Sequence, residues 1–218
     1  MVEIEQYLRE LSAQLHARFG KRLLYIGLQG SYQRGEAGEN SDIDIMVLLD
    51  ALYAEDLDSY RMALEAVGHA ELACGFIAGK EDLQCWNALE ICHLLHTTQD
   101  YYGRLACYVP QYTRGDIVQF VKLSIGNLYH GLCHSRIYAP RGKEKNMLAG
   151  AYKSAFFILQ NLHYLESGEF IATRAALKAA LTGDDRAVME QWHGTDDEAF
   201  SLLLGWCQQA LKRADCLQ

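Results

Sequence analysis

The chain has 218 residues, half of them apolar, and a formal net charge of −8. This is enough for one large domain or two small ones with buried cores. The acidic balance argues against general binding to nucleic-acid backbones, which requires clustered Lys and Arg. No apolar run approaches the roughly eighteen residues of a membrane helix, and the N-terminus is an acidic amphipathic segment rather than a signal peptide. Seven cysteines with no CxxC pair predict reduced thiols and a cytoplasmic protein.

Helical and strand patterns alternate in the first half of the chain. Residues 3–19 repeat apolar side chains at helical spacing, and residues 23–28 form a strand pattern. A short helical turn capped by Ser31 and a second strand at 42–49 follow. A helix is predicted at 55–67 and a third strand at 72–78, closed by Gly79. The helix between the second and third strands implies that these two strands run parallel.

Helical patterns dominate beyond residue 101. Helices are predicted at 115–138, 145–166, 173–182 and 196–213, with breaks at Pro140, Gly168 and Gly183. We therefore expect an α/β (α+β) domain with a small mixed sheet at residues 1–100. An all-α helical bundle is expected to follow at residues 101–218.

One segment, GSYQRGEAGENSDIDIMVLL at residues 30–49, combines a Gly-Ser pair with two aspartates that open a strand. Side chains alternate along a strand, so Asp42 and Asp44 share one face and Ile43 points to the other. Two carboxylates this close repel each other unless a cation lies between them. Mg²⁺ suits such ligands and usually completes its shell with substrate phosphates. Gly30 permits close approach of the backbone to a phosphate, and Ser31 can cap the following turn.

The spacing from the first strand through Gly30-Ser31 and ten further residues to Asp42 and Asp44 closely resembles the nucleotidyltransferase superfamily typified by DNA polymerase beta. The residue pattern of the segment resembles the antibiotic-modifying enzymes of the kanamycin and lincosamide types and the minimal nucleotidyltransferases more closely than the polymerases. This resemblance covers residues 23–50. The helical second half is similar to the kanamycin nucleotidyltransferase architecture by element order alone.

The resemblance implies a reaction and a cofactor. A nucleoside monophosphate would pass from an NTP, expected to be ATP, to a hydroxyl group of an acceptor, and pyrophosphate would leave. Asp42 and Asp44 would hold one or two Mg²⁺ ions. Gly30, Ser31 and nearby amides would bind the terminal phosphates, which Arg34 is positioned to reach with two donors. Arg34 and Glu36 alone would be an ordinary surface ion pair.

The family also has a third carboxylate on a neighbouring strand, as metal ligand or general base. Glu71 is favoured because the start of a parallel third strand lies beside Asp42 and Asp44. Glu81 and Asp82 are the alternatives, if the chain turns back after Gly79.

Two features of the helical half have a functional and a plain structural interpretation. Lys153 would meet the triphosphate, as a bundle lysine does in similar enzymes, or its ammonium group would extend to solvent. His130 and His134, four residues apart, have a zinc-binding spacing without a third ligand, and suit a polar cleft wall equally well.

Three functions are compatible with these features. The first, which we favour, is transfer of a nucleoside monophosphate to a small molecule, such as an aminoglycoside-like antibiotic. The second is modification of a protein, as in adenylylating antitoxins, and the third is nucleotide binding without catalysis. The acceptor, the preferred base and the oligomeric state stay open.

Overall fold

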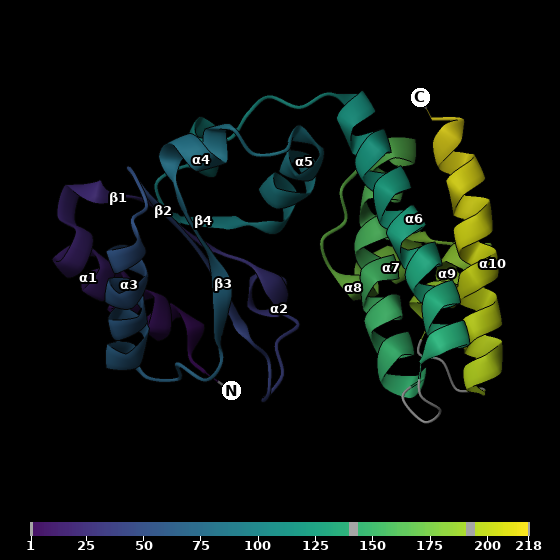
Figure 1. Ribbon diagram of the computed structural model, residues 1–218, viewed down its shortest axis with the longest axis horizontal. Coiled ribbons are helices and arrows are strands. Elements are labelled where there is room, and N and C mark those ends of the chain that lie inside the picture. The colour runs from purple at the N-terminus through teal and green to yellow at the C-terminus, as the bar shows by residue number, and fades with distance from the viewer. Residues whose placement is uncertain (1, 140–143, 191–194, 218) are drawn as a thin grey trace. The chain divides into compact units, whose positions relative to one another are not determined.

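The computed structural model describes residues 2–139, 144–190 and 195–217. The chain forms two compact units, Met1–Gln111 and Tyr112–Gln218. The first unit contains the sheet, and the second is built from helices (Figure 1). The expected fold class, a small mixed sheet with helices followed by a helical region, is confirmed.

The sheet has four strands in the order β3-β2-β1-β4. They are β1 (Leu23–Leu28), β2 (Ile43–Leu49), β3 (Ala73–Gly79) and β4 (Gln99–Tyr102). β1 pairs with β2 and with β4 in antiparallel fashion, whereas β2 and β3 run parallel, as the intervening helix α3 (Ala54–Val67) predicts.

Each face of this sheet packs against its own hydrophobic cluster. On one face α1 (Ile4–Phe19) and α3 lie beside each other in Figure 1, and Leu11 and Leu15 of α1 are fully buried against Ile43 and Ile45 of β2. On the other face Met46 and Leu48 pack with Tyr25 of β1 and with Leu83. Successive residues of β2 thus enter different clusters, which follows from the alternation of side chains along a strand.

Short elements complete the first unit. α2 (Gly30–Gln33) joins β1 to β2, while α4 (Lys80–Gln84) and α5 (Ala88–Thr97) follow β3. The 3₁₀ turns η1 (Gly20–Arg22) and η2 (Leu105–Cys107) lie beside β1 and after β4. The sequence did not predict α4, α5 or β4. All four residues of β4 are exposed, so that strand lacks the polar and apolar alternation by which strands are recognised.

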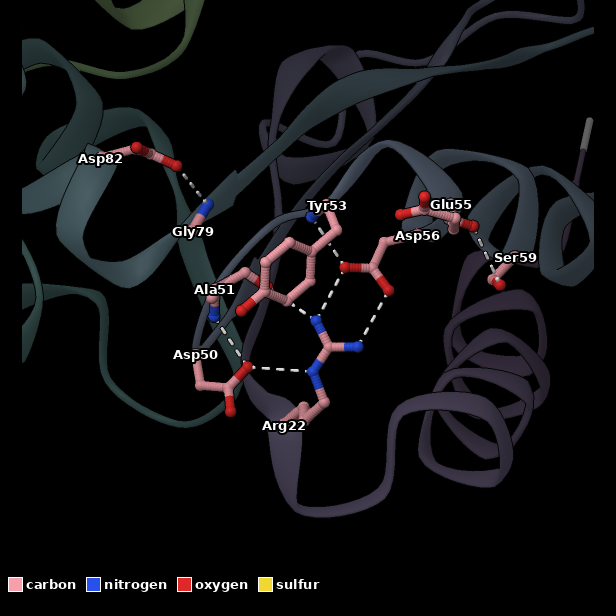
Figure 2. Close-up of polar contacts among 9 residues, drawn as sticks. All are labelled: Arg22, Asp50, Ala51, Tyr53, Glu55, Asp56, Ser59, Gly79 and Asp82. Carbon is pink, nitrogen blue, oxygen red and sulfur yellow. Dashed lines mark hydrogen bonds and ion pairs between the residues drawn. The ribbon is translucent and has the colours of Figure 1, made fainter.

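An ion-pair network connects the end of β2 to the start of α3 (Figure 2). The Arg22 guanidinium donates to both carboxylate oxygens of Asp56, at 2.9 and 2.7 Å, to Asp50 at 3.1 Å and to the Ala51 carbonyl at 2.9 Å. Asp56 also accepts from the backbone N–H of Tyr53 at 2.9 Å. The Arg22 hydrogen bonds, with the Tyr53 backbone bond, hold the pKa of the buried Asp56 carboxyl below its usual value.

The helical unit contains α6 (Arg114–Tyr138), α7 (Glu144–Ser167), α8 (Arg174–Ala180), α9 (Gly183–Met189) and α10 (Asp196–Asp215). The predicted helices at 115–138, 145–166 and 196–213 agree with α6, α7 and α10. The helix predicted at 173–182 ends at Ala180, because Leu181 is extended and buried. The sequence did not predict α9. Asp185 of α9 accepts from the indole of Trp206 at 2.7 Å and pairs with Arg213 at 2.8 Å, which attaches α9 to α10.

Candidate functional site

Asp42 and Asp44 lie at the start of β2, on the face of the sheet opposite α1. Ile43 and Ile45, between and after them, are buried in the cluster formed with α1. Asp44 is half-buried and Asp42 is exposed, so both carboxylates can reach a ligand. The predicted arrangement of the two side chains on one face therefore agrees with the pleat of β2. Two adjacent carboxylates on one face are a suitable pair for a hard divalent cation.

Gly30 brings the backbone of α2 directly against Asp44. A Cβ built on Gly30 would lie 1.8 Å from Oδ2 of Asp44, and the residue has a φ of +68°, which favours glycine. No other residue type fits this position without displacing the carboxylate.

The predicted capping role of Ser31 is wrong. α2 begins at Gly30, so its N-cap is the extended residue Gln29, and no side chain caps the helix. Ser31 is therefore the second helical residue, half-buried, and its hydroxyl has no capping partner. Its predicted role with phosphate stays a prediction.

Four residues on neighbouring segments form a row across the sheet that includes Asp44. Asp44 is the register partner of Cys74 on β3, and the backbone N–H of Gln29 donates to the Asp44 carbonyl at 2.8 Å. The Gln29 side-chain amide donates to the hydroxyl of Thr98 at 2.8 Å, just before β4. The order Cys74, Asp44, Gln29, Thr98 depends on strand pairing, and the sequence pattern indicated no role for Cys74, Gln29 or Thr98.

Cys74 occupies the place on β3 from which a side chain can meet Asp44. The thiol is exposed, and its pKa is raised by partial burial and by the neighbouring negative charge of Asp44. A carboxylate at this position would face Asp44 directly. Because position 74 is a cysteine, β3 supplies no third carboxylate there, beside Asp42 and Asp44.

The contacts of Glu71 do not support its predicted role as the third carboxylate. Glu71 precedes β3, and its carboxylate lies 3.9 Å from Nδ1 of His69. Its charge contributes to the raised pKa of Tyr7 on α1, although burial of Tyr7 is the larger cause. Tyr7 belongs to the cluster on the face opposite Asp42 and Asp44. Glu71 lies in the turn before β3, so the alternation that brings Cys74 to Asp44 does not extend to it, and its observed interactions are with His69 and Tyr7.

Glu81 and Asp82 lie at the far end of β3. Gly79 is paired with Leu49, five residues along from the pair of Asp44 and Cys74, which corresponds to about 16 Å along the strand. The carboxylate of Asp82 accepts from the backbone N–H of Gly79 at 3.2 Å and so caps α4 (Figure 2). The chain continues into α4 and does not turn back toward Asp44, so this alternative is not supported either.

A group of cationic and imidazole side chains lies beside α2. Arg34, at the end of α2, is largely buried and pairs with Glu36 at 2.9 Å. The pKa of His93 on α5 is lowered to about 4, chiefly by burial and further by His96 and the charge of Arg34. Burial also lowers the pKa of His96. The ion-pair interpretation of Arg34 is therefore present in the structure, and its phosphate role stays a prediction.

Lys153 and the two histidines of the bundle were further candidates. Lys153 lies on α7 with its side chain exposed, and its role with the triphosphate stays a prediction. The rings of His130 and His134 are 5.9 Å apart, and His134 lies 4.9 Å from the ring of Tyr138. Over residues 2–139, 144–190 and 195–217, no group of three or more His, Cys, Asp or Glu side chains has metal-binding geometry. The zinc interpretation thus has no third ligand in that part of the chain.

The described helices include none that is long and apolar enough to cross a bilayer.

Comparison with known proteins gives matches to parts of this chain. Residues 8–84, from α1 through α4, match the nucleotidyltransferase domain family. Protein adenylyltransferase MntA of Thermococcus cleftensis is 53% identical over 45 residues, which are 21% of this chain and 43% of that protein. The chain thus spans less than half the length of this curated relative.

A structural comparison covers nearly the whole chain. Spectinomycin adenyltransferase AAD(9) from Enterococcus faecialis, solved with ATP and spectinomycin, superimposes with a TM-score of 0.62. The alignment covers 95% of this chain and 99% of that one at 12% identity, which shows a shared fold. Residues 8–84, which carry the motif at Gly30, Asp42 and Asp44, are therefore similar to nucleotidyltransferase domains, and the fold of the chain resembles that of an antibiotic adenyltransferase.

Proposed function

We propose that the protein transfers a nucleoside monophosphate from an NTP, most simply ATP, to a hydroxyl group of a small molecule and releases pyrophosphate. The observation that carries this proposal is the contact of Gly30 with Asp44 beside Asp42. A backbone in the left-handed region that favours glycine, with no room for a Cβ, is held against one of two carboxylates that share a sheet face. Such an arrangement allows phosphate oxygens to approach both the backbone and a metal ligand.

Each candidate site residue of the first unit has a distinct role in this proposal. Asp42 and Asp44 hold one or two Mg²⁺ ions, since two carboxylates together with phosphate oxygens are ligands that Mg²⁺ accepts. When bound, Mg²⁺ supplies positive charge that offsets the charge on the phosphate oxygens. Gly30 and Ser31 bind the terminal phosphates, and Arg34 adds a charged donor. Positioning and neutralisation of charge are the main contributions that such a transfer requires.

Support for a small-molecule acceptor comes from the fold. The superposition with an adenyltransferase of spectinomycin extends over the helical unit as well as the sheet. The net charge of −8 also favours a cationic acceptor over a polyanionic one. Lys153 in the helical unit is proposed to contact the triphosphate, and Glu71 receives no role because its contacts are with His69 and the α1 face.

The test is a two-step screen of the full chain. Calorimetric titration with ATP, GTP, CTP and UTP, with and without Mg²⁺, identifies the nucleotide. That nucleotide is then incubated with spectinomycin, kanamycin and lincomycin, and the product mass and pyrophosphate are measured. We expect metal-dependent binding in the wild type and none in Asp44→Asn. Metal-independent binding, or binding that survives Asp44→Asn, contradicts the proposed site.

A second candidate, transfer to a protein, is favoured by the match with a protein adenylyltransferase over 45 residues. The size of the helical unit counts against it, because adenylylating antitoxins usually consist of little more than the catalytic domain. Intact-protein mass spectrometry distinguishes the two functions. A mass increase of one nucleoside monophosphate on a partner protein, with no modified small molecule, would favour the second. Metal-dependent nucleotide binding without any transfer would favour the non-catalytic alternative.

A further inference from the structure

Gln29 lies beside Asp44 and is held in place through both its backbone and its side chain. Its backbone N–H donates to the Asp44 carbonyl at 2.8 Å, one residue beyond the pair of Leu28 and Ile45. In an antiparallel pair, residues opposite each other point to the same face, so Gln29 shares the face of Asp44. The residue is half-buried.

The hydroxyl of Thr98 fixes which end of the Gln29 amide faces it. Thr98 Oγ1 donates its single proton to the Leu94 carbonyl at 2.7 Å. It can therefore only accept from Gln29, whose Nε2 lies 2.8 Å away. The reversed amide would set two acceptors against each other. The NH₂ group is thus committed to Thr98, and Oε1 points to the other side.

The carbonyl oxygen of this amide has no hydrogen-bond partner among residues 2–139, 144–190 and 195–217. No described residue hydrogen-bonds to Gln29 Oε1, and unlike Oε1 of Gln33 it is not sealed from solvent. Only the NH₂ group of the amide is needed to hold the end of α5 through Thr98. The oriented and accessible oxygen next to Asp44 has no part in that contact. The oxygen suits a ligand that brings a hydrogen-bond donor.

We propose that Gln29 is a positioning residue of the nucleotide site and that its Oε1 accepts a hydrogen bond from a ribose hydroxyl of the NTP. This inference rests on the proposed function. A carbonyl oxygen repels phosphate oxygens, so its partner is a donor. The donors of an NTP are its ribose hydroxyls and, in some nucleotides, an exocyclic amino group. The ribose is bonded directly to the α-phosphate, whereas the base is one sugar further from the phosphates that Gly30 and Asp44 are proposed to bind.

The test measures whether loss of the Gln29 amide and loss of one ribose hydroxyl weaken nucleotide binding through the same hydrogen bond. ATP, 2′-deoxy-ATP and 3′-deoxy-ATP are titrated calorimetrically with Mg²⁺ into wild type, Gln29→Met and Thr98→Val. Methionine keeps the length of the side chain without its polar atoms. One hydrogen bond corresponds to about a 2- to 12-fold change in Kd. We expect wild type to bind one of the two deoxy nucleotides more weakly than ATP by such a factor. Gln29→Met should bind that deoxy nucleotide and ATP with the same Kd.

Thr98→Val separates this role from a purely structural one. It removes the anchor of the amide but keeps Oε1, so some preference for the hydroxyl should remain. If Gln29 only anchors α5, Gln29→Met weakens ATP and both deoxy nucleotides equally, and the inference is overturned. Equal binding of all three nucleotides by wild type also overturns it. Absence of any metal-dependent binding to wild type would instead refute the proposed function on which it rests.

Discussion

Replacement of Gly30 by alanine should disturb both stability and the candidate site. The added Cβ would lie 1.8 Å from Oδ2 of Asp44, and the backbone would keep a φ of +68°. A left-handed conformation costs an L-residue about 1–2 kcal/mol. Displacement of the carboxylate adds an overpacking cost of about 1–3 kcal/mol. Gly30→Ala is therefore expected to lower the free energy of unfolding by about 2–5 kcal/mol.

Gly35 provides a matched control five residues away. It has the same φ of +68°, but a Cβ there meets no atom within 4 Å. Gly35→Ala should therefore lose only the backbone contribution of about 1–2 kcal/mol. The difference between the two variants isolates the contact with Asp44.

Urea unfolding of the full chain measures both variants, and the double variant Gly30→Ala with Asp44→Ala completes a cycle. The double variant should lose less stability than the sum of the single variants, because the smaller side chain removes the clash. Gly30→Ala should also weaken Mg²⁺-dependent ATP binding, whereas Gly35→Ala should not. Equal destabilisation by the two alanines, with ATP binding intact in both, would refute the reasoning from this contact.

Four further variants test the charges of the first unit. Asp44→Asn should abolish metal-dependent turnover and leave the melting temperature of the free protein equal or higher, since it relieves repulsion; full activity would contradict the assignment. Cys74→Asp should lower that melting temperature and tighten Mn²⁺ binding measured by calorimetry, and unchanged Mn²⁺ affinity would show that position 74 does not face the metal. Asp56→Asn should cost about 1–3 kcal/mol at pH 7, because it removes the charge that accepts two bonds from the partly exposed Arg22, which keeps its bonds to Asp50 and Ala51. Because the folded pKa of Asp56 is lowered, this stability is present above the unfolded pKa of about 4 and is lost as pH falls below it, so urea unfolding should show the gap to wild type closing in acid. His93 has a folded pKa of about 4 against about 6.5 unfolded, so the unfolded chain binds the extra proton and stability falls from pH 6.5 to 4; His93→Gln should flatten that slope.

Local patterns in the sequence determined most of the fold. Helical periodicity located α1, α3, α6, α7 and α10, and apolar runs located β1, β2 and β3. The parallel pairing of β2 with β3 followed from the helix between them. The failures are elements without such patterns: β4 is fully exposed, and α9 is held by the contacts of Asp185 with Trp206 and Arg213. Their positions depend on neighbours that periodicity does not reveal.

The sequence alone also predicted Gly30, Asp42 and Asp44 as site residues, because a glycine at a fixed spacing from two alternating aspartates is a local pattern. Only the tertiary structure decided which side chains join them. The register of β2 and β3 brings Cys74 to Asp44, and the extension of β1 brings Gln29 beside Asp44. A shift of one residue in either pairing would reverse these faces, and register is set by the packing of whole strands rather than by neighbouring residues in sequence.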